Sequence, residues 1–168
     1  MKLLIVVDMQ KDFIDGALGS AEAVAIVPPV KALIEGFDGK VLFTRDTHFD
    51  NYMQTEEGKH LPVPHCIKDT DGWQIHPELD ALRTTQPIDK LTFGSKELIA
   101  LLADENDVES ITLCGLCTDI CVISNAMLIK AYYPEIPLFV VANACAGVTP
   151  ESHQNALAAM KMCQVEIL

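Results

Sequence analysis

The chain has 168 residues and a formal net charge of −12, with 49% hydrophobic and 21% charged residues. This length and composition are typical of a globular domain, so we expect residues 1–168 to fold as a single domain. The negative charge argues against nucleic acids and anionic membrane surfaces as partners, because binding to either requires clusters of Lys and Arg.

No apolar run approaches the roughly 20 residues that a transmembrane helix needs. The apolar stretch Leu3–Val7 is too short for a secretory signal, and it ends at Asp8. We therefore expect a cytoplasmic protein whose thiols stay reduced. Its six cysteines then indicate metal binding, catalysis or core packing rather than a disulfide framework.

Short apolar runs alternate along the chain with segments of helical periodicity. The predicted strands are Leu3–Val7, Lys40–Thr44, Pro87–Lys90, Ser110–Cys114, Pro137–Ala142 and Val165–Leu168. The predicted helices are Ala21–Phe37, regular after Pro28 and Pro29, then Ser95–Asp104, Thr118–Tyr132 and Thr149–Cys163. The alternation predicts a three-layer α/β/α fold of the Rossmann type, with a central, mostly parallel sheet of about six strands.

One long segment interrupts this alternation. Asp46–Gly72 is polar, rich in His, Pro and Gly, and has no clear period. A structureless loop of this length inside a compact domain is usually functional.

Polar or reactive side chains follow four of the predicted strands. They are Asp8, Asp46 with His48, Lys90, and the cysteine-rich turn that begins at Cys114. Ligands of open parallel sheets bind beyond the carboxyl ends of the strands. We therefore expect these groups to converge at one edge of the sheet.

Asp8 and Lys90 each have a functional and a structural interpretation. Asp8 directly follows apolar residues, so it is either a general base whose pKa burial raises or a cap in the following loop. Lys90 either takes part in a functional site at the edge of the sheet or forms a structural salt bridge. Asp89 is the weaker partner for that salt bridge, because neighbours on a strand face opposite ways.

The Asp-x-His sequence at 46–48 predicts a metal site. Asp46 and His48 point the same way in an extended backbone, and His65 follows in the stiff sequence LPVPHC. One carboxylate and two imidazoles suit zinc or a similar divalent ion with open positions. A fourth ligand would come from Glu56, Glu57 or His60, of which we favour Glu57. The alternative is a polar loop without a metal.

The stretch CGLCTDICV holds three cysteines that invite different interpretations. Cys114 ends an apolar strand and is expected to be a core residue. A thioredoxin-type pair would open the helix with its first cysteine, and a zinc knuckle needs a second Cys/His pair, so both are disfavoured. Cys121 falls in the first helical turn, where the dipole and free N–H groups favour a thiolate and an oxyanion hole.

Five motifs in order resemble those of the isochorismatase-like cysteine hydrolases, and among them most closely the nicotinamidases and related amidases. These motifs are LLIVVDMQKDF, RDTH, PHC, DKLTFGS and GLCTDICV. The resemblance implies an amidase that hydrolyses a small amide through a cysteine thioester. The expected substrate is nicotinamide, and the alternative is another amide or carbamoyl substrate of the family. It also implies a small-molecule substrate and a homo-oligomer.

The resemblance assigns roles to individual positions. It implies the catalytic triad Asp8, Lys90 and Cys121, a cis peptide between Leu116 and Cys117, and an oxyanion hole from the N–H groups of Cys117 and Cys121. It implies Asp46, His48 and His65 as ligands of a divalent metal, zinc by preference. A metal-free isochorismatase would leave these three ligands unexplained.

The substrate pocket departs from the family pattern. Thr47, Val63 and Ile120 occupy positions where nicotinamidases often carry aromatic residues. We therefore expect the pocket to be lined by Phe13, Trp73, Phe93 and Ile120. A non-catalytic receiver-like domain is the alternative from another class, but Met9 follows Asp8 where such a domain needs a second carboxylate.

Overall fold

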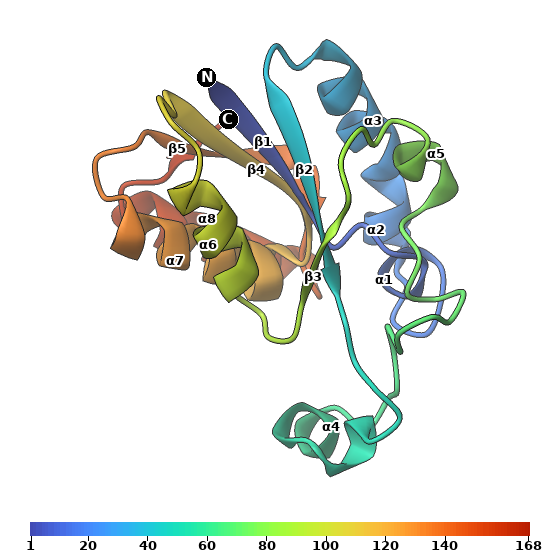
Figure 1. The fold of residues 1–168 in the computed structure, drawn as a ribbon. Helices are drawn as coiled ribbons and strands as arrows, with labels where there is room; N and C mark the ends of the chain where they lie inside the picture. Colours follow the sequence, from blue (N-terminus) through green and yellow to red (C-terminus); the bar gives the residue numbers. More distant parts are fainter.

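The computed structural model describes residues 1–168 and contains a sheet of six strands (Figure 1). The strands are β1 (Lys2–Val7), β2 (Lys40–Asp46), β3 (Ile88–Lys90), β4 (Ser110–Leu116), β5 (Leu138–Ala146) and β6 (Glu166–Ile167). Their order is β3-β2-β1-β4-β5-β6, and all neighbours are parallel. The winding reverses between β1 and β4, which is where ligands of such sheets bind.

Helices cover both faces of the sheet. They are α1 (Lys11–Ile14), α2 (Ala21–Ala25), α3 (Val27–Gly36), α4 (Glu56–His60), α5 (Pro77–Asp80), α6 (Lys96–Ala103), α7 (Ile123–Tyr132) and α8 (Pro150–Met162). Helices α6, α7 and α8 lie on one face, and α1, α2, α3 and α5 lie on the other (Figure 1). This arrangement confirms the predicted three-layer fold. None of the helices has the length and apolar character needed to cross a membrane.

The central strand β1 forms the middle of the core. Leu3–Val7 is fully buried, and β1 pairs with β2 on one side and β4 on the other. A parallel strand that helices cover on both faces must be apolar on both faces, which explains the uninterrupted sequence LLIVV. The core therefore fixes the position at which the chain leaves β1, and Asp8 is the first residue beyond it.

The predicted helix over 21–37 is divided into α2 and α3 at Ile26. Ser20 caps α2, its side chain accepting a hydrogen bond from the Ala23 N–H at 3.0 Å. Pro28 and Pro29 lie in the first turn of α3, where their missing N–H groups cost nothing. The same prolines would remove two bonds from an unbroken helix.

The segment 46–72 is ordered, contrary to the expectation of a structureless loop. It contains a 3₁₀ turn, η1 (Tyr52–Gln54), and helix α4, and it extends away from the rest of the molecule in Figure 1. The Thr55 side chain caps α4 by accepting from the Gly58 N–H at 3.0 Å. The buried Tyr52 hydroxyl donates to the Leu61 carbonyl at 2.8 Å and ties the segment together.

Candidate active site

Four side chains from four strand ends form one buried cluster. Asp8 follows β1, Asp46 ends β2, Lys90 ends β3, and Cys121 lies in the π-helical turn η2 (Thr118–Val122) after β4. All four are buried. The structure thus brings together the predicted residues, because the carboxyl ends of parallel strands meet at one edge.

Lys90 is the centre of this cluster. Its Nζ lies 2.7 Å from Asp8 Oδ2, 3.1 Å from Asp46 Oδ1 and 3.4 Å from Cys121 Sγ. Burial alone would lower the pKa of Lys90, but electrostatic interactions with Asp8, Cys121 and Asp46 raise it well above its usual value. The lysine is therefore a fixed ammonium that faces both carboxylates and the thiol.

Asp8 is held as a buried carboxyl group next to that ammonium. Thr44 Oγ1 donates to Asp8 Oδ1 at 2.6 Å and accepts from the Asp8 N–H at 3.2 Å. Burial raises the pKa of Asp8, Lys90 opposes this, and Asp46 adds to it. A carboxylate with a raised pKa is a stronger proton acceptor.

Cys121 differs in one respect from the expectation of a thiolate at a helix start. Burial and the nearby Asp8 raise the pKa of the Cys121 thiol well above its usual value, although Lys90 opposes them. The dipole argument neglected the desolvation of a thiol that is almost wholly buried. The resting thiol keeps its proton, so its use as a nucleophile requires a base beside it.

The turn that carries Cys121 is fixed from several sides. The peptide bond between Leu116 and Cys117 is cis, as the resemblance implies. The N–H groups of Ile120 and Val122 both donate to the Cys117 carbonyl, at 3.1 and 3.0 Å. Thr118 Oγ1 lies 2.7 Å from His153 Nδ1, which links the turn to α8.

Sequence analysis missed three polar residues that hold the site in place. Asn125 Nδ2 donates to the carbonyls of Cys121 at 2.8 Å and Phe93 at 3.1 Å. Gln10 accepts from the Asp46 N–H at 2.7 Å and donates to the Asp46 carbonyl at 2.8 Å. These two and Thr44 are fully buried. The sequence feature that could have identified them is a polar residue inside or directly beside an apolar run.

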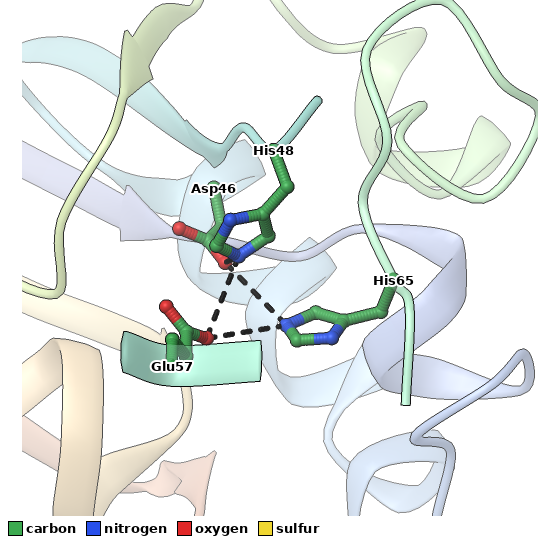
Figure 2. Close-up of side chains that lie close together, drawn as sticks. All are labelled: Asp46, His48, Glu57 and His65. Atoms are coloured by element: carbon green, nitrogen blue, oxygen red, sulfur yellow. Dashed lines mark hydrogen bonds and ion pairs between the residues drawn. The ribbon is translucent and has the colours of Figure 1, made fainter. Parts of the chain in front are cut away.

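A second group of four side chains, which shares Asp46 with the first cluster, converges on a small volume, as Figure 2 shows. One ligand atom each from Asp46, His48, Glu57 and His65 lies within 4.8 Å of all the others. Of the three candidates for a fourth ligand, Glu57 is the one in this cluster. It comes from α4, which explains why the segment 46–72 must be ordered.

The donor geometry of this cluster suits a divalent cation. His48 Nε2 lies 2.9 Å from Asp46 Oδ2 and 3.4 Å from Glu57 Oε1, and His65 Nε2 lies 3.8 and 3.5 Å from the same atoms. His65 Nδ1 contacts the Val63 carbonyl at 2.8 Å, which leaves Nε2 free to bind a metal. Two imidazoles and two carboxylates are a common ligand set for zinc and for other first-row metals.

The charge of the cluster also favours a cation. Burial lowers the pKa of His48, but hydrogen bonds to Asp46 and Glu57 raise it to about 9. Burial raises the pKa of Glu57, but the two imidazoles lower it to about 2. The two carboxylates therefore keep His48 protonated. A bound metal ion would supply the positive charge in place of this proton.

Both clusters border one cavity of about 1150 Å³. Its wall includes Cys121, Cys117 and Leu116 on one side and the four potential metal ligands on another. Three of the expected pocket residues line it, namely Phe13, Phe93 and Ile120.

Trp73, the fourth expected pocket residue, lies outside the cavity. Its indole Nε1 donates to Thr47 Oγ1 at 2.9 Å, and the Arg45 guanidinium covers its ring at 3.5 Å. The expectation was wrong because Trp73 was chosen only as an aromatic residue that replaces the missing ones. Nothing in the sequence places its ring at the cavity. The ring is buried against Arg45 and Thr47 instead of facing the cavity.

The fold and the site define a doubly wound α/β protein whose reactive side chains lie at the switch point of its sheet. The chain belongs to the isochorismatase family, because the family model described as "Isochorismatase domain" matches residues 2–168.

Known proteins similar to this chain include nicotinamidases. The nicotinamidase/pyrazinamidase of Mycobacterium tuberculosis is 27% identical over 185 residues, which cover 100% of this chain and 98% of the relative. The crystal structure of a pyrazinamidase/nicotinamidase from Streptococcus mutans has a TM-score of 0.85 and 29% identity, covering 100% of both chains. A zinc complex of the pyrazinamidase of Pyrococcus horikoshii has a TM-score of 0.82 and 27% identity, covering 99% of this chain and 98% of that one.

Proposed function

We propose that the protein is a metal-containing cysteine amidohydrolase that converts nicotinamide, or a closely related neutral primary amide, to the carboxylic acid and ammonia. One observation carries the proposal. A buried Asp–Lys–Cys cluster and a cluster suited to a cation face the same cavity and share Asp46, whose two oxygens contact Lys90 and the two histidines. The similarity to nicotinamidases supports a hydrolase acting on C–N amide bonds.

The first half of the reaction forms a thioester. Asp8 takes the proton of the Cys121 thiol, and the ammonium of Lys90 stabilises the thiolate as it forms. The thiolate attacks the amide carbonyl, and the N–H groups of Cys117 and Cys121 stabilise the oxyanion. Asp8 then returns the proton to the nitrogen, and ammonia leaves.

The second half of the reaction regenerates the enzyme. A water molecule gives a proton to Asp8 and attacks the thioester carbonyl. The C–S bond breaks, the carboxylic acid leaves, and the proton returns to Cys121. One amide and one water thereby yield one acid and one ammonia without any net oxidation or reduction.

Asp46, His48, Glu57 and His65 would hold the divalent metal, and zinc fits these ligands best among the ions that the donor set permits. A bound metal of this kind acts as a Lewis acid that anchors a substrate ring or polarises a water. Lys90 connects the two clusters through Asp46, so it orients both the carboxylate at the metal site and the carboxylate that acts as the base.

The cavity wall favours a neutral amide over a carbamoyl amino acid. Its lining residues include Asp46, Glu56 and Glu57 but no Lys or Arg. A substrate carboxylate would find no Lys or Arg in the wall, so its only cationic partners would be the histidines or the bound metal. The lack of a basic side chain supports a neutral amide such as nicotinamide as the substrate.

Ammonia release from purified protein tests the proposal. Nicotinamide should be hydrolysed, Cys121→Ala should abolish the reaction, and Cys117→Ala should keep it, because Cys117 contributes only its backbone N–H. Activity that survives in Cys121→Ala, or that disappears in Cys117→Ala with the protein still folded, would contradict the assigned nucleophile.

A further inference from the structure

The cavity extends well beyond the reacting groups, to an outer rim of apolar side chains. This rim consists of Leu61 after α4, Leu91 and Phe93 after β3, and Val148 after β5, all lining the cavity. Their side chains are 38%, 56%, 43% and 60% exposed, respectively. Large apolar side chains gathered at one opening and left in contact with water indicate a surface that a ligand covers.

The cavity is too large for a pyridine carboxamide alone. Ligand sites of about 300–1,000 Å³ accommodate drug-sized molecules, and this cavity measures about 1150 Å³. A pyridine carboxamide placed against Cys121 would fill only part of this volume. The rim would then stay uncovered throughout the reaction.

The reacting end of the substrate has a defined orientation. Asp8, which must reach the leaving nitrogen, is fully buried and is not part of the cavity wall. The leaving nitrogen is therefore expected to point inward, toward this buried carboxyl group. Any extension of the substrate has to leave from the acyl side and run outward to the rim.

We propose, building on the proposed amidase activity, that the preferred substrate is a primary amide with an uncharged, apolar extension on its acyl side. The inner end places the carboxamide at Cys121, and the extension lies on Leu61, Leu91, Phe93 and Val148. The cavity wall holds no Lys or Arg that would pair with an acidic extension. Coverage of the rim removes apolar surface from water, which favours binding of the extended amide.

A substrate series with matched variants tests this assignment. Ammonia release is measured for nicotinamide, benzamide, 4-hexylbenzamide and 4-carboxybenzamide with the metal-loaded protein. The value of kcat/KM should rise at least about tenfold from benzamide to 4-hexylbenzamide, equivalent to about 1.4 kcal/mol, and it should fall for 4-carboxybenzamide. The ratio of kcat/KM for 4-hexylbenzamide to that for benzamide should shrink in Leu91→Ser and Val148→Ser.

A control substitution has the same chemistry at a site outside the cavity wall. Leu168→Ser replaces a side chain that is 59% exposed and does not line the cavity, and it should keep the full gain of the wild type.

Several outcomes would overturn the proposal. Equal or lower kcat/KM for 4-hexylbenzamide alongside active hydrolysis of nicotinamide contradicts the apolar extension and leaves the amidase function intact. A change in mass from oligomer to monomer in Leu91→Ser, measured by sedimentation, shows that a second copy of the chain covers the rim. Hydrolysis of none of the amides contradicts both proposals.

Discussion

At the scale of single residues, one lysine connects two kinds of chemistry. The ammonium of Lys90 contacts both Asp8, the proposed base for the thiol, and Asp46, one of the four proposed metal ligands. Its full burial leaves no water to take over either interaction. The sequence predicted that the residues converge but not this sharing, because a strand position gives the direction of a side chain and not the length of its reach.

Replacement of Lys90 should therefore destabilise the fold as well as stop catalysis. Lys90→Met leaves two buried carboxylates without their common counter-ion, so the free energy of unfolding should fall by about 3 kcal/mol or more in urea titration of metal-free protein. Lys31→Met, which breaks the exposed pair with Glu78, should cost at most about 1 kcal/mol. Equal losses in both variants would contradict a central role for Lys90.

The fourth metal ligand can be tested with neighbouring residues of the same type. Glu57→Ala should lower metal affinity at least about tenfold, and Glu56→Ala should not, since only Glu57 lies in the cluster. His48→Ala should likewise lose metal, whereas His60→Ala should keep it. Metal-to-protein stoichiometry after dialysis against a chelator gives the answer, and equal retention by Glu57→Ala and Glu56→Ala would remove Glu57 from the site.

At the scale of elements, the turn η2 depends on helix α7, which follows it directly, and on helix α8, which follows only after β5. Asn125 in α7 joins the Cys121 carbonyl to the loop after β3, and His153 in α8 contacts Thr118. Asn125→Ala leaves the Ser95 N–H without its acceptor and the Cys121 carbonyl without its donor. Because these groups are buried, the unfolding free energy should fall by about 1–3 kcal/mol.

The substitution Asn125→Ala should also lower kcat more than it raises KM. The reason is that Asn125 holds the turn η2, which carries Cys121, and does not line the cavity. Steady-state kinetics separates the two effects. An unchanged kcat in a measurably destabilised Asn125→Ala protein would show that the turn keeps its geometry without this bond.

His153 gives the link between η2 and α8 a dependence on pH. Burial lowers the pKa of His153 below 6.5, although Asp119 opposes this. The folded state prefers the neutral imidazole, so its stabilising contribution is complete above pH 6.5 and is lost as the pH falls through the lower folded-state pKa. The difference in unfolding free energy between wild type and His153→Gln should thus shrink on acidification below pH 6.5. A difference that is constant from pH 7.5 to pH 5 would contradict this.

At the scale of the whole molecule, the sequence predicted best where hydrophobic periodicity decides the structure. The run LLIVV identified β1, and the alternation of strands and helices predicted the parallel sheet and its functional edge. Prediction failed for the segment 46–72, because Thr55 and Tyr52 order it through capping and a tertiary hydrogen bond that leave no periodic pattern. It failed for Trp73 because a cation–π contact with Arg45 was not visible in the sequence.

The most direct test of the whole account is mass spectrometry of the protein quenched with acid during turnover of nicotinamide. The account predicts a nicotinoyl group bound as a thioester to Cys121, identified by tandem fragmentation of the peptide that also carries Cys114 and Cys117. The adduct should be absent from Cys121→Ala and from samples quenched after the substrate is exhausted. Ammonia release with the acyl group on Cys117, or with no acyl group on any cysteine, would contradict it.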